Sequence, residues 1–219
     1  MEADVFFFQE YSPHLYDYLK NRREHHIKCD PSKDTMIIAK KTTFPDMKDE
    51  ELVLGKLTQE QRDNLNWSDR SAFMVVENYI LIDAHLSSKE QKNKEQMEQL
   101  RQGLAALKST LPQYEVILGG DLNSFLKVPD LPKGFSMYPD EPGQLTTVKK
   151  RTMTQAQFHK GNKIIQESKD KVVSTLAICD QRIMYISGVV PKHDNYVPTD
   201  EHPFDHFLLV CRLIKPKAA

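Results

Sequence analysis

Short apolar runs with the length of buried strands recur along the first half of the chain. Residues 4–8, DVFFF, and residues 35–41, TMIIAKK, are two such runs, and both are rich in residues that favour strands. Two more runs, residues 71–76 and 79–84, are separated by Glu77-Asn78, a dipeptide suited to a hairpin turn because asparagine tolerates a positive φ. This pattern predicts a sheet in the first half of the chain.

Two other segments follow the period of a helix. Ser12-Pro13 supplies an N-cap and a first-turn proline for a helix that runs through about Arg23. From Ser88 to about Lys108, apolar side chains recur at steps of three and four among Lys, Glu and Gln, which predicts an amphipathic surface helix closed by Pro112. The polar segment between Thr42 and Asn66 is predicted to hold a loop and one short helix.

The second half of the chain contains more strands and fewer helices. A buried strand is predicted at Glu115–Leu118, stopped by Gly119-Gly120, and later candidates are 172–175, 182–187 and 207–213. Strands alternate with helices early and with loops late, which favours an α/β layered sandwich. Because no repeat or Gly/Ser linker interrupts the chain, we expect a single domain over residues 1–219.

Composition sets limits on partners and compartment. The 219 residues include 30 basic and 31 acidic side chains, and the net charge of −1 gives no overall basic field of the kind that marks many nucleic-acid-binding proteins. The three cysteines, Cys29, Cys179 and Cys211, are widely spaced and form no disulfide framework, so we expect an intracellular, reducing location such as the cytoplasm. No stretch approaches the roughly 20 apolar residues of a membrane span, so no transmembrane segment is expected.

Polar clusters follow two of the apolar runs. Glu10 comes directly after DVFFF, and a carboxylate at that point is a candidate ligand for Mg²⁺, which prefers oxygen donors. The alternative for Glu10 is a solvated strand end. His85 follows the strand 79–84 and could donate to a phosphate oxygen or protonate a leaving group, unless it is a hydrogen-bonded structural histidine.

Two later clusters carry stronger chemistry. In Gly119-Gly120-Asp121-Leu122-Asn123-Ser124, the glycines allow a tight turn, after which Asp121 and Asn123 project to the same side. A carboxylate beside a carboxamide suits a phosphoryl site, although a structural Asx turn uses the same residue types. Asp205-His206 stands directly before the last apolar run, where the carboxylate could orient the imidazole.

The order of these clusters resembles that of the endonuclease/exonuclease/phosphatase superfamily, which has the deoxyribonuclease-like fold. The superfamily's recurring elements are a QE strand end, a THL-like strand end, GDxN and a terminal SDH. They read here as Gln9-Glu10, Ala84-His85-Leu86, Gly120-Asp121-Leu122-Asn123 and Phe204-Asp205-His206. The resemblance covers essentially the whole chain. It implies two packed, mostly antiparallel sheets flanked by helices in a four-layer sandwich, and metal-dependent hydrolysis of phosphate esters.

The resemblance also implies a role for each matching residue. Glu10 and Asp205 would hold Mg²⁺ or Mn²⁺, a Lewis acid that offsets charge on the phosphate. The other implied roles are activation of the attacking water by Asp121, binding of the scissile phosphate by Asn123, stabilisation of the transition state by His206, and contact with the phosphate or leaving group by His85.

Two features depart from the superfamily pattern. The superfamily opens with a strand ending in a metal-binding asparagine, and this chain starts at the following strand. We therefore expect upstream residues, another element of the chain or a partner protein to cover that position. The second departure concerns the superfamily's aspartate that opens a strand before the terminal SDH. Asp170 and Asp180 are both candidates for this aspartate. Asp170 is preferred because it stands one residue from a strand.

The substrate is left open by the sequence. RNA, DNA, phosphoinositides and phospholipid head groups all fit a phosphoesterase. Residues 149–164 hold five Lys or Arg and could line a groove for a polyanion, or form a solvated basic loop. The alternative to an enzyme is a catalytically silent relative that serves as a binding or structural module in a larger assembly.

Overall fold

A computed structural model describes residues 3–11, 13–29, 34–66, 70–123, 130–139, 147–151, 163–167, 169–184 and 208–214. The helices are α1 (Pro13–Leu19), α2 (Glu50–Leu54), α3 (Gln59–Asp63) and α4 (Glu90–Thr110). The strands are β1 (Val5–Gln9), β2 (His25–Cys29), β3 (Thr35–Lys40), β4 (Ser71–Val76), β5 (Tyr79–Ala84), β6 (Glu115–Asp121), β7 (Ser136–Tyr138), β8 (Thr147–Arg151), β9 (Lys163–Glu167), β10 (Asp170–Ser174), β11 (Ala177–Met184) and β12 (Leu208–Ile214).

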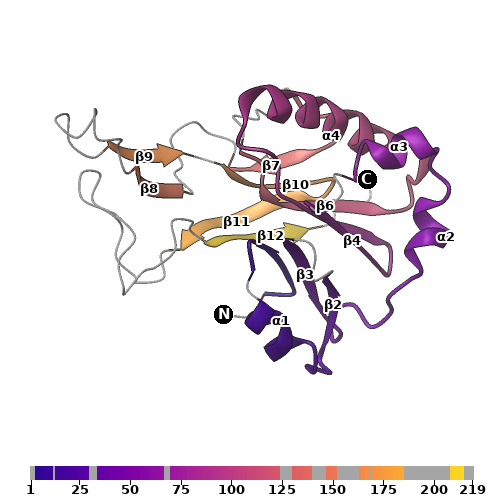
Figure 1. The fold of residues 1–219 in the computed structure, drawn as a ribbon. Coiled ribbons are helices and arrows are strands. Elements are labelled where there is room, and N and C mark those ends of the chain that lie inside the picture. Colours follow the sequence, from indigo (N-terminus) through magenta and orange to yellow (C-terminus); the bar gives the residue numbers. More distant parts are fainter. Residues whose placement is uncertain are drawn as a thin grey trace.

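The strands form two larger sheets and two pairs. Sheet A has the order β1-β3-β2 and is antiparallel throughout. Sheet B has the order β4-β5-β6-β10-β7, in which only the β5–β6 pair is parallel. The antiparallel pairs are β11–β12 and β8–β9, and Figure 1 shows β8–β9 standing away from the two sheets.

Two apolar clusters hold the layers together. One joins sheets A and B, and it packs β3 residues such as Ile37 against Met74 and Leu81 of sheet B. The other joins sheet B to α4, whose Leu100 and Leu104 are almost fully buried. Figure 1 shows α4 and α1 on opposite sides of the stacked sheets. The predicted α/β fold with mostly antiparallel sheets flanked by helices is therefore confirmed.

The parallel β5–β6 pair brings two predicted clusters together. Helix α4 connects the two strands, so both run in the same direction and end at the same edge of sheet B. In the register of this pair, Asp83 lies opposite Gly119. His85 and Asp121, each two residues further on, therefore emerge side by side.

Strand β6 corrects the prediction for Gly119-Gly120. The strand does not stop at the glycines but runs through them to Asp121. Gly120 has a φ of +151°, and a Cβ at this position would lie 1.9 Å from the carbonyl oxygen of Ala84. A Cβ on Gly119 would lie 2.3 Å from the ring of Phe7. The glycines thus let β6 pass close to β5 and β1, rather than turn away from them.

Other boundaries also differ from the predictions. Helix α1 ends at Leu19 instead of continuing to Arg23, and strand β2 follows it unpredicted. The sequence of β2, HHIKC, has no clear apolar alternation because β2 is the edge strand of sheet A and all five residues are only partly buried. The segment 42–66 contains two short helices, α2 and α3, instead of one.

The later strands were predicted with shifted bounds. Strand β10 begins at Asp170, two residues before the predicted start at Val172, and β12 runs one residue beyond the predicted end at Leu213. Strand β11 begins at Ala177 rather than Arg182, with an irregularity between Cys179 and Arg182. Strands β8 and β9 cover the two ends of the basic segment 149–164, and residues 152–162 lie outside the described part of the chain.

Two further features are the pairing of β1 and the character of the helices. Within the described ranges, β1 pairs only with β3, and the predicted covering of its position by upstream residues, another element or a partner stays a prediction. None of the described helices has the length and apolar character needed to cross a membrane.

Candidate active site

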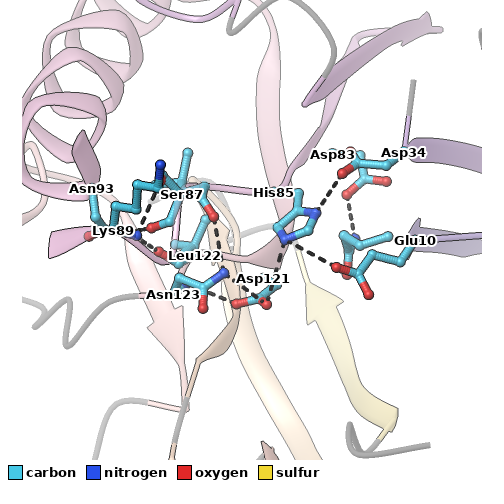
Figure 2. Close-up of polar contacts among 12 residues, drawn as sticks. Glu10, Asp34, Asp83, His85, Ser87, Lys89, Asn93, Asp121, Leu122 and Asn123 are labelled. Carbon is cyan, nitrogen blue, oxygen red and sulfur yellow. Dashed lines mark hydrogen bonds and ion pairs between the residues drawn. The ribbon is translucent and has the colours of Figure 1, made fainter. Parts of the chain in front are cut away.

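His85 lies at the centre of a group of carboxylates at the ends of β1, β5 and β6 (Figure 2). Its Nδ1 is 2.9 Å from Oδ2 of Asp34, the residue that precedes β3. The side chain of His85 is only 6% exposed, so the contact with Asp34 fixes a ring that is already buried. The arrangement is that of an imidazole oriented by a carboxylate through one nitrogen, which leaves the other nitrogen to act on a ligand.

The second nitrogen of His85 faces two predicted site residues. Its Nε2 lies 3.8 Å from Oε1 of Glu10 and 3.9 Å from Oδ2 of Asp121. The Glu10 side chain is 76% exposed, whereas Asp121 is 9% exposed. Glu10 follows β1 with a φ of +52°, and its backbone N–H donates to the carbonyl of Asp34. The structure thus brings Glu10, His85 and Asp121 together.

Asn123 is bound directly to Asp121. The backbone N–H of Asn123 donates to Oδ1 of Asp121 at 2.9 Å, and its Nδ2 donates to Oδ2 of the same carboxylate at 3.0 Å. The same Nδ2 donates to the carbonyl of Leu86 at 3.0 Å. With a φ of +47°, Asn123 closes an Asx-type turn that fixes the Asp121 carboxylate. The amide therefore orients the predicted base as well as standing beside it.

Two polar residues of α4 hold the loops that carry His85 and Asn123. Nδ2 of buried Asn93 donates to the carbonyls of Ser87 and Leu122, at 2.8 Å each. Oε1 of Gln96 accepts from the backbone N–H of Ser87 at 2.8 Å. Because these bonds join both loops to one rigid helix, α4 fixes the distance between His85 and Asn123.

A buried carboxylate ties the strand ends of the two sheets together. Asp83 is fully buried, and its Oδ1 accepts from Nε2 of Gln9 at 2.5 Å, while its Oδ2 accepts from the backbone N–H of Met36 at 3.0 Å. Burial raises the pKa of Asp83 well above its ordinary value, and the bonds from Gln9 and Met36 oppose that rise only in part. The contact joins β5 to β1 and β3 beside Glu10.

Replacing Asp83 by asparagine should change how stability depends on pH. Because the folded-state pKa is raised, the contribution of Asp83 to stability is greatest below the unfolded pKa of about 3.9 and is lost as pH rises through the folded value. Asparagine keeps the shape and carries no proton, and the Gln9 amide can turn to accept from it. We expect the stability of Asp83→Asn relative to wild type to increase from pH 5 to pH 8 in urea unfolding.

The exposed Asp46, whose side chain makes no hydrogen bond or ion pair within the described residues, provides the matched control. Asp46→Asn should leave the difference from wild type unchanged between the two pH values. An Asp83→Asn difference that stays constant, or declines with pH, would contradict a raised pKa for Asp83.

The structure also positions the two candidates for the strand-opening aspartate. Asp170 is buried, opens β10 and pairs in register with Asp121. Asp180 is exposed within the irregular part of β11, has a φ of +48° and lies 3.2 Å from Nε of Arg212. Asp170 is thus the candidate beside the site. Asp205 and His206 lie outside the described residues, so their predicted roles stay predictions.

The cluster is strongly acidic, which bears on whether a metal ion fits. Glu10, Asp34 and Asp121 lie around His85, and Asp170 lies in register with Asp121, so a compensating cation would favour the approach of a phosphate. The exposed oxygens of Glu10 suit a hard cation. Within the described ranges, however, no three His, Cys, Asp or Glu side chains are arranged to hold one. Glu10 would need further ligands, such as the predicted Asp205.

Several residues of this site were not predicted. Asp34 stands directly before an apolar run, so a search of both ends of each strand would have found it. Asp83 is an acid inside the otherwise apolar strand YILIDA, which is itself a signal of a buried polar contact. Asn93 and Gln96 carry no such signal, because polar residues are ordinary on a surface helix.

The chain resembles known proteins in structure rather than in sequence. No family model and no curated protein sequence matches the chain. Among solved structures, D. rerio TDP2 complexed with a single-strand DNA product is 16% identical, with a TM-score of 0.61 over 95% of this chain and 85% of that chain. C. elegans TDP2 is 14% identical, with a TM-score of 0.60 over 94% and 64%.

An AP endonuclease from Archaeoglobus fulgidus is 15% identical, with a TM-score of 0.54 over 96% of this chain and 89% of that chain. At these identities the likeness establishes the fold. The chain therefore shares its fold with these TDP2 and AP endonuclease structures, in line with the deoxyribonuclease-like fold that its motifs predict.

Proposed function

We propose that this protein is a divalent-metal-dependent phosphoesterase that hydrolyses phosphodiester bonds of nucleic acid with an activated water. The observation that carries the proposal is the convergence of Glu10, His85 and Asp121 from three strand ends of this fold. Nucleic acid is the favoured substrate class because one of the similar structures is complexed with single-strand DNA product.

Asp121 is the proposed general base. Its carboxylate is almost buried and is held by two hydrogen bonds from Asn123, so it presents a fixed oxygen to a water in the site. Asn123 is proposed to bind a phosphate oxygen once its Nδ2 exchanges a protein acceptor for the substrate. His85, oriented by Asp34, would donate from Nε2 to the phosphate or the leaving group.

A bound Mg²⁺ or Mn²⁺ would supply the positive charge that the acidic cluster lacks, and Glu10 and Asp205 are its proposed ligands. Asp205 and His206 are proposed to complete the site from outside the described residues. Asp170 would act by supporting Asp121, its partner in the ladder between β6 and β10.

A catalytically silent binding module is the second candidate. It is favoured by one observation, that the described side chains include no complete metal-binding group. The two candidates differ in chemistry rather than in fold, so an activity measurement separates them. The residues of the site are proposed to be retained for catalysis, because a silent module has no chemical need for His85, Asp121 and Asn123 together.

The test is hydrolysis of a panel with and without Mg²⁺ or Mn²⁺. The substrates are bis-p-nitrophenyl phosphate, single-stranded DNA and RNA oligonucleotides, and inositol phosphates. We expect metal-dependent cleavage of an oligonucleotide that EDTA abolishes. Activity that survives EDTA would contradict the mechanism, and no hydrolysis of any substrate with either metal would favour the silent module.

A further inference from the structure

A polar concavity lies away from the candidate active site. It has a volume of about 400 Å³ and is lined by residues of the turn between α1 and β2, by β2 and by the residue after β3. Five of its lining residues are basic or can become so, and none is acidic: Lys20, Arg22, Arg23, His25 and Lys41.

The cavity lies at the end of sheet A opposite the candidate active site. His25 pairs with Lys40 at one end of β3, whereas Gln9, the neighbour of Glu10, pairs with Thr35 at the other. The six residues of β3 span about 17 Å at roughly 3.3 Å per residue. A ligand held in the cavity is therefore not the group that His85 contacts.

The positive charge of the cavity is only partly neutralised within the protein. Lys20 pairs with Asp17 at 2.7 Å and Arg22 approaches Glu24 at 3.6 Å, but both acids are more than half exposed. Among the described residues, the exposed side chains of Arg23 and Lys41 make no ion pair or hydrogen bond. Two cations thus face the cavity without a partner, beside two that are weakly paired.

We propose that this cavity is a binding site for a ligand carrying consecutive phosphate groups. Guanidinium groups bind phosphate through paired N–H donors, and lysine adds a point charge, so the lining matches a polyphosphate better than a single carboxylate. The volume lies within the range of roughly 300–1,000 Å³ typical of small-ligand sites, which is more than one phosphate fills. The site is independent of the chemistry proposed at Asp121.

Consecutive phosphates can come from a nucleotide or from the backbone of a nucleic-acid strand. Both present the same chemistry to Arg23 and Lys41, and they differ in length. A free polyphosphate reports on the cavity alone. An oligonucleotide shows whether a nucleic-acid strand that reaches the cavity also binds other parts of the protein.

The test uses the full chain in EDTA, with tripolyphosphate measured by calorimetry and a labelled single-stranded oligonucleotide by fluorescence anisotropy. The variant Arg23→Gln/Lys41→Gln removes the two unpaired charges, and Lys56→Gln/Lys92→Gln removes two exposed lysines elsewhere as a matched control. We expect the first variant to weaken tripolyphosphate binding at least tenfold and the control to change it less than twofold. Thermal unfolding checks that both variants fold.

Oligonucleotide binding shows whether the consecutive phosphates belong to a nucleic-acid strand or to a small compound. If a nucleic-acid strand occupies the cavity, Arg23→Gln/Lys41→Gln weakens oligonucleotide binding as well as tripolyphosphate binding. The slope of log K against log salt for the oligonucleotide then becomes shallower by about 1.4, for two lost phosphate contacts. If only tripolyphosphate binding falls, the ligand is a small phosphate compound. Equal weakening by the two double variants, or no measurable tripolyphosphate binding by the wild type, would overturn the site.

Discussion

Replacing Asp121 by alanine is expected to lower the rate of phosphoester hydrolysis a hundredfold or more. Loss of a positioned general base typically costs a factor of about 10²–10⁴. The carboxylate of Asp121 is 9% exposed and receives two hydrogen bonds from Asn123, so its removal also frees the amide that stands beside it. The loss should therefore fall on kcat, measured with an oligonucleotide and saturating Mg²⁺.

Asp46→Ala is the matched control, because Asp46 is an exposed aspartate away from the site. It should keep the wild-type rate. Asp121→Ala must also retain a cooperative thermal transition, so that a folding defect is not read as a catalytic one. A folded Asp121→Ala protein with more than a tenth of the wild-type kcat would show that another group activates the water.

The second large effect is expected from the pair of His85 and Asp34. His85→Ala should reduce kcat about a hundredfold, as loss of a general acid does, and Asp34→Asn should reduce it about tenfold or more by releasing the imidazole. Because Asp34 acts through His85, the double variant should be no slower than His85→Ala alone, within about twofold. Steady-state kinetics of the four proteins completes the cycle.

A structural role alone predicts a different result. If Asp34 only supports the fold, its effect on kcat should add to that of His85. We expect instead that the two effects do not add, because Asp34→Asn acts on kcat only through the orientation of His85. Additive losses would remove Asp34 from the mechanism.

The strands and helices that follow strict periodicity could be predicted from the sequence. The strands around residues 4–8, 35–41, 71–76 and 79–84, and the helix from about residue 90, all have clear apolar patterns and were found within a few residues. Strand β2 was missed because edge strands tolerate polar residues. The bounds of β6 were wrong because a glycine pair can signal either a turn or a close approach, and only the neighbouring strands distinguish the two.

The candidate site was predicted from local motifs, and what local motifs cannot show is contact between distant elements. Glu10, His85 and Asp121 each follow a strand, so their position at a shared edge could be inferred. Asp34 reaches His85 across 51 positions of sequence, and Asp83 reaches Gln9 across 74, through the packing of sheet A on sheet B. Such pairs depend on the stacking of the sheets, which no single motif encodes.

The glycine pair of β6 bears on how relatives of this protein could be recognised. A side chain at Gly120 would collide with the backbone of Ala84 whatever residues make up the rest of the sheet, whereas one at Gly119 would collide with the ring of Phe7. Surface and core positions can drift while hydrophobicity and volume are kept, as the 14–17% identities to similar folds illustrate. Positions limited by backbone geometry cannot drift in this way. A glycine at position 120, placed directly before an Asp-x-Asn sequence at the end of an apolar run, should therefore outlast most other similarity between this chain and its distant evolutionary relatives, and Gly119 should persist as long as a large ring faces it from β1.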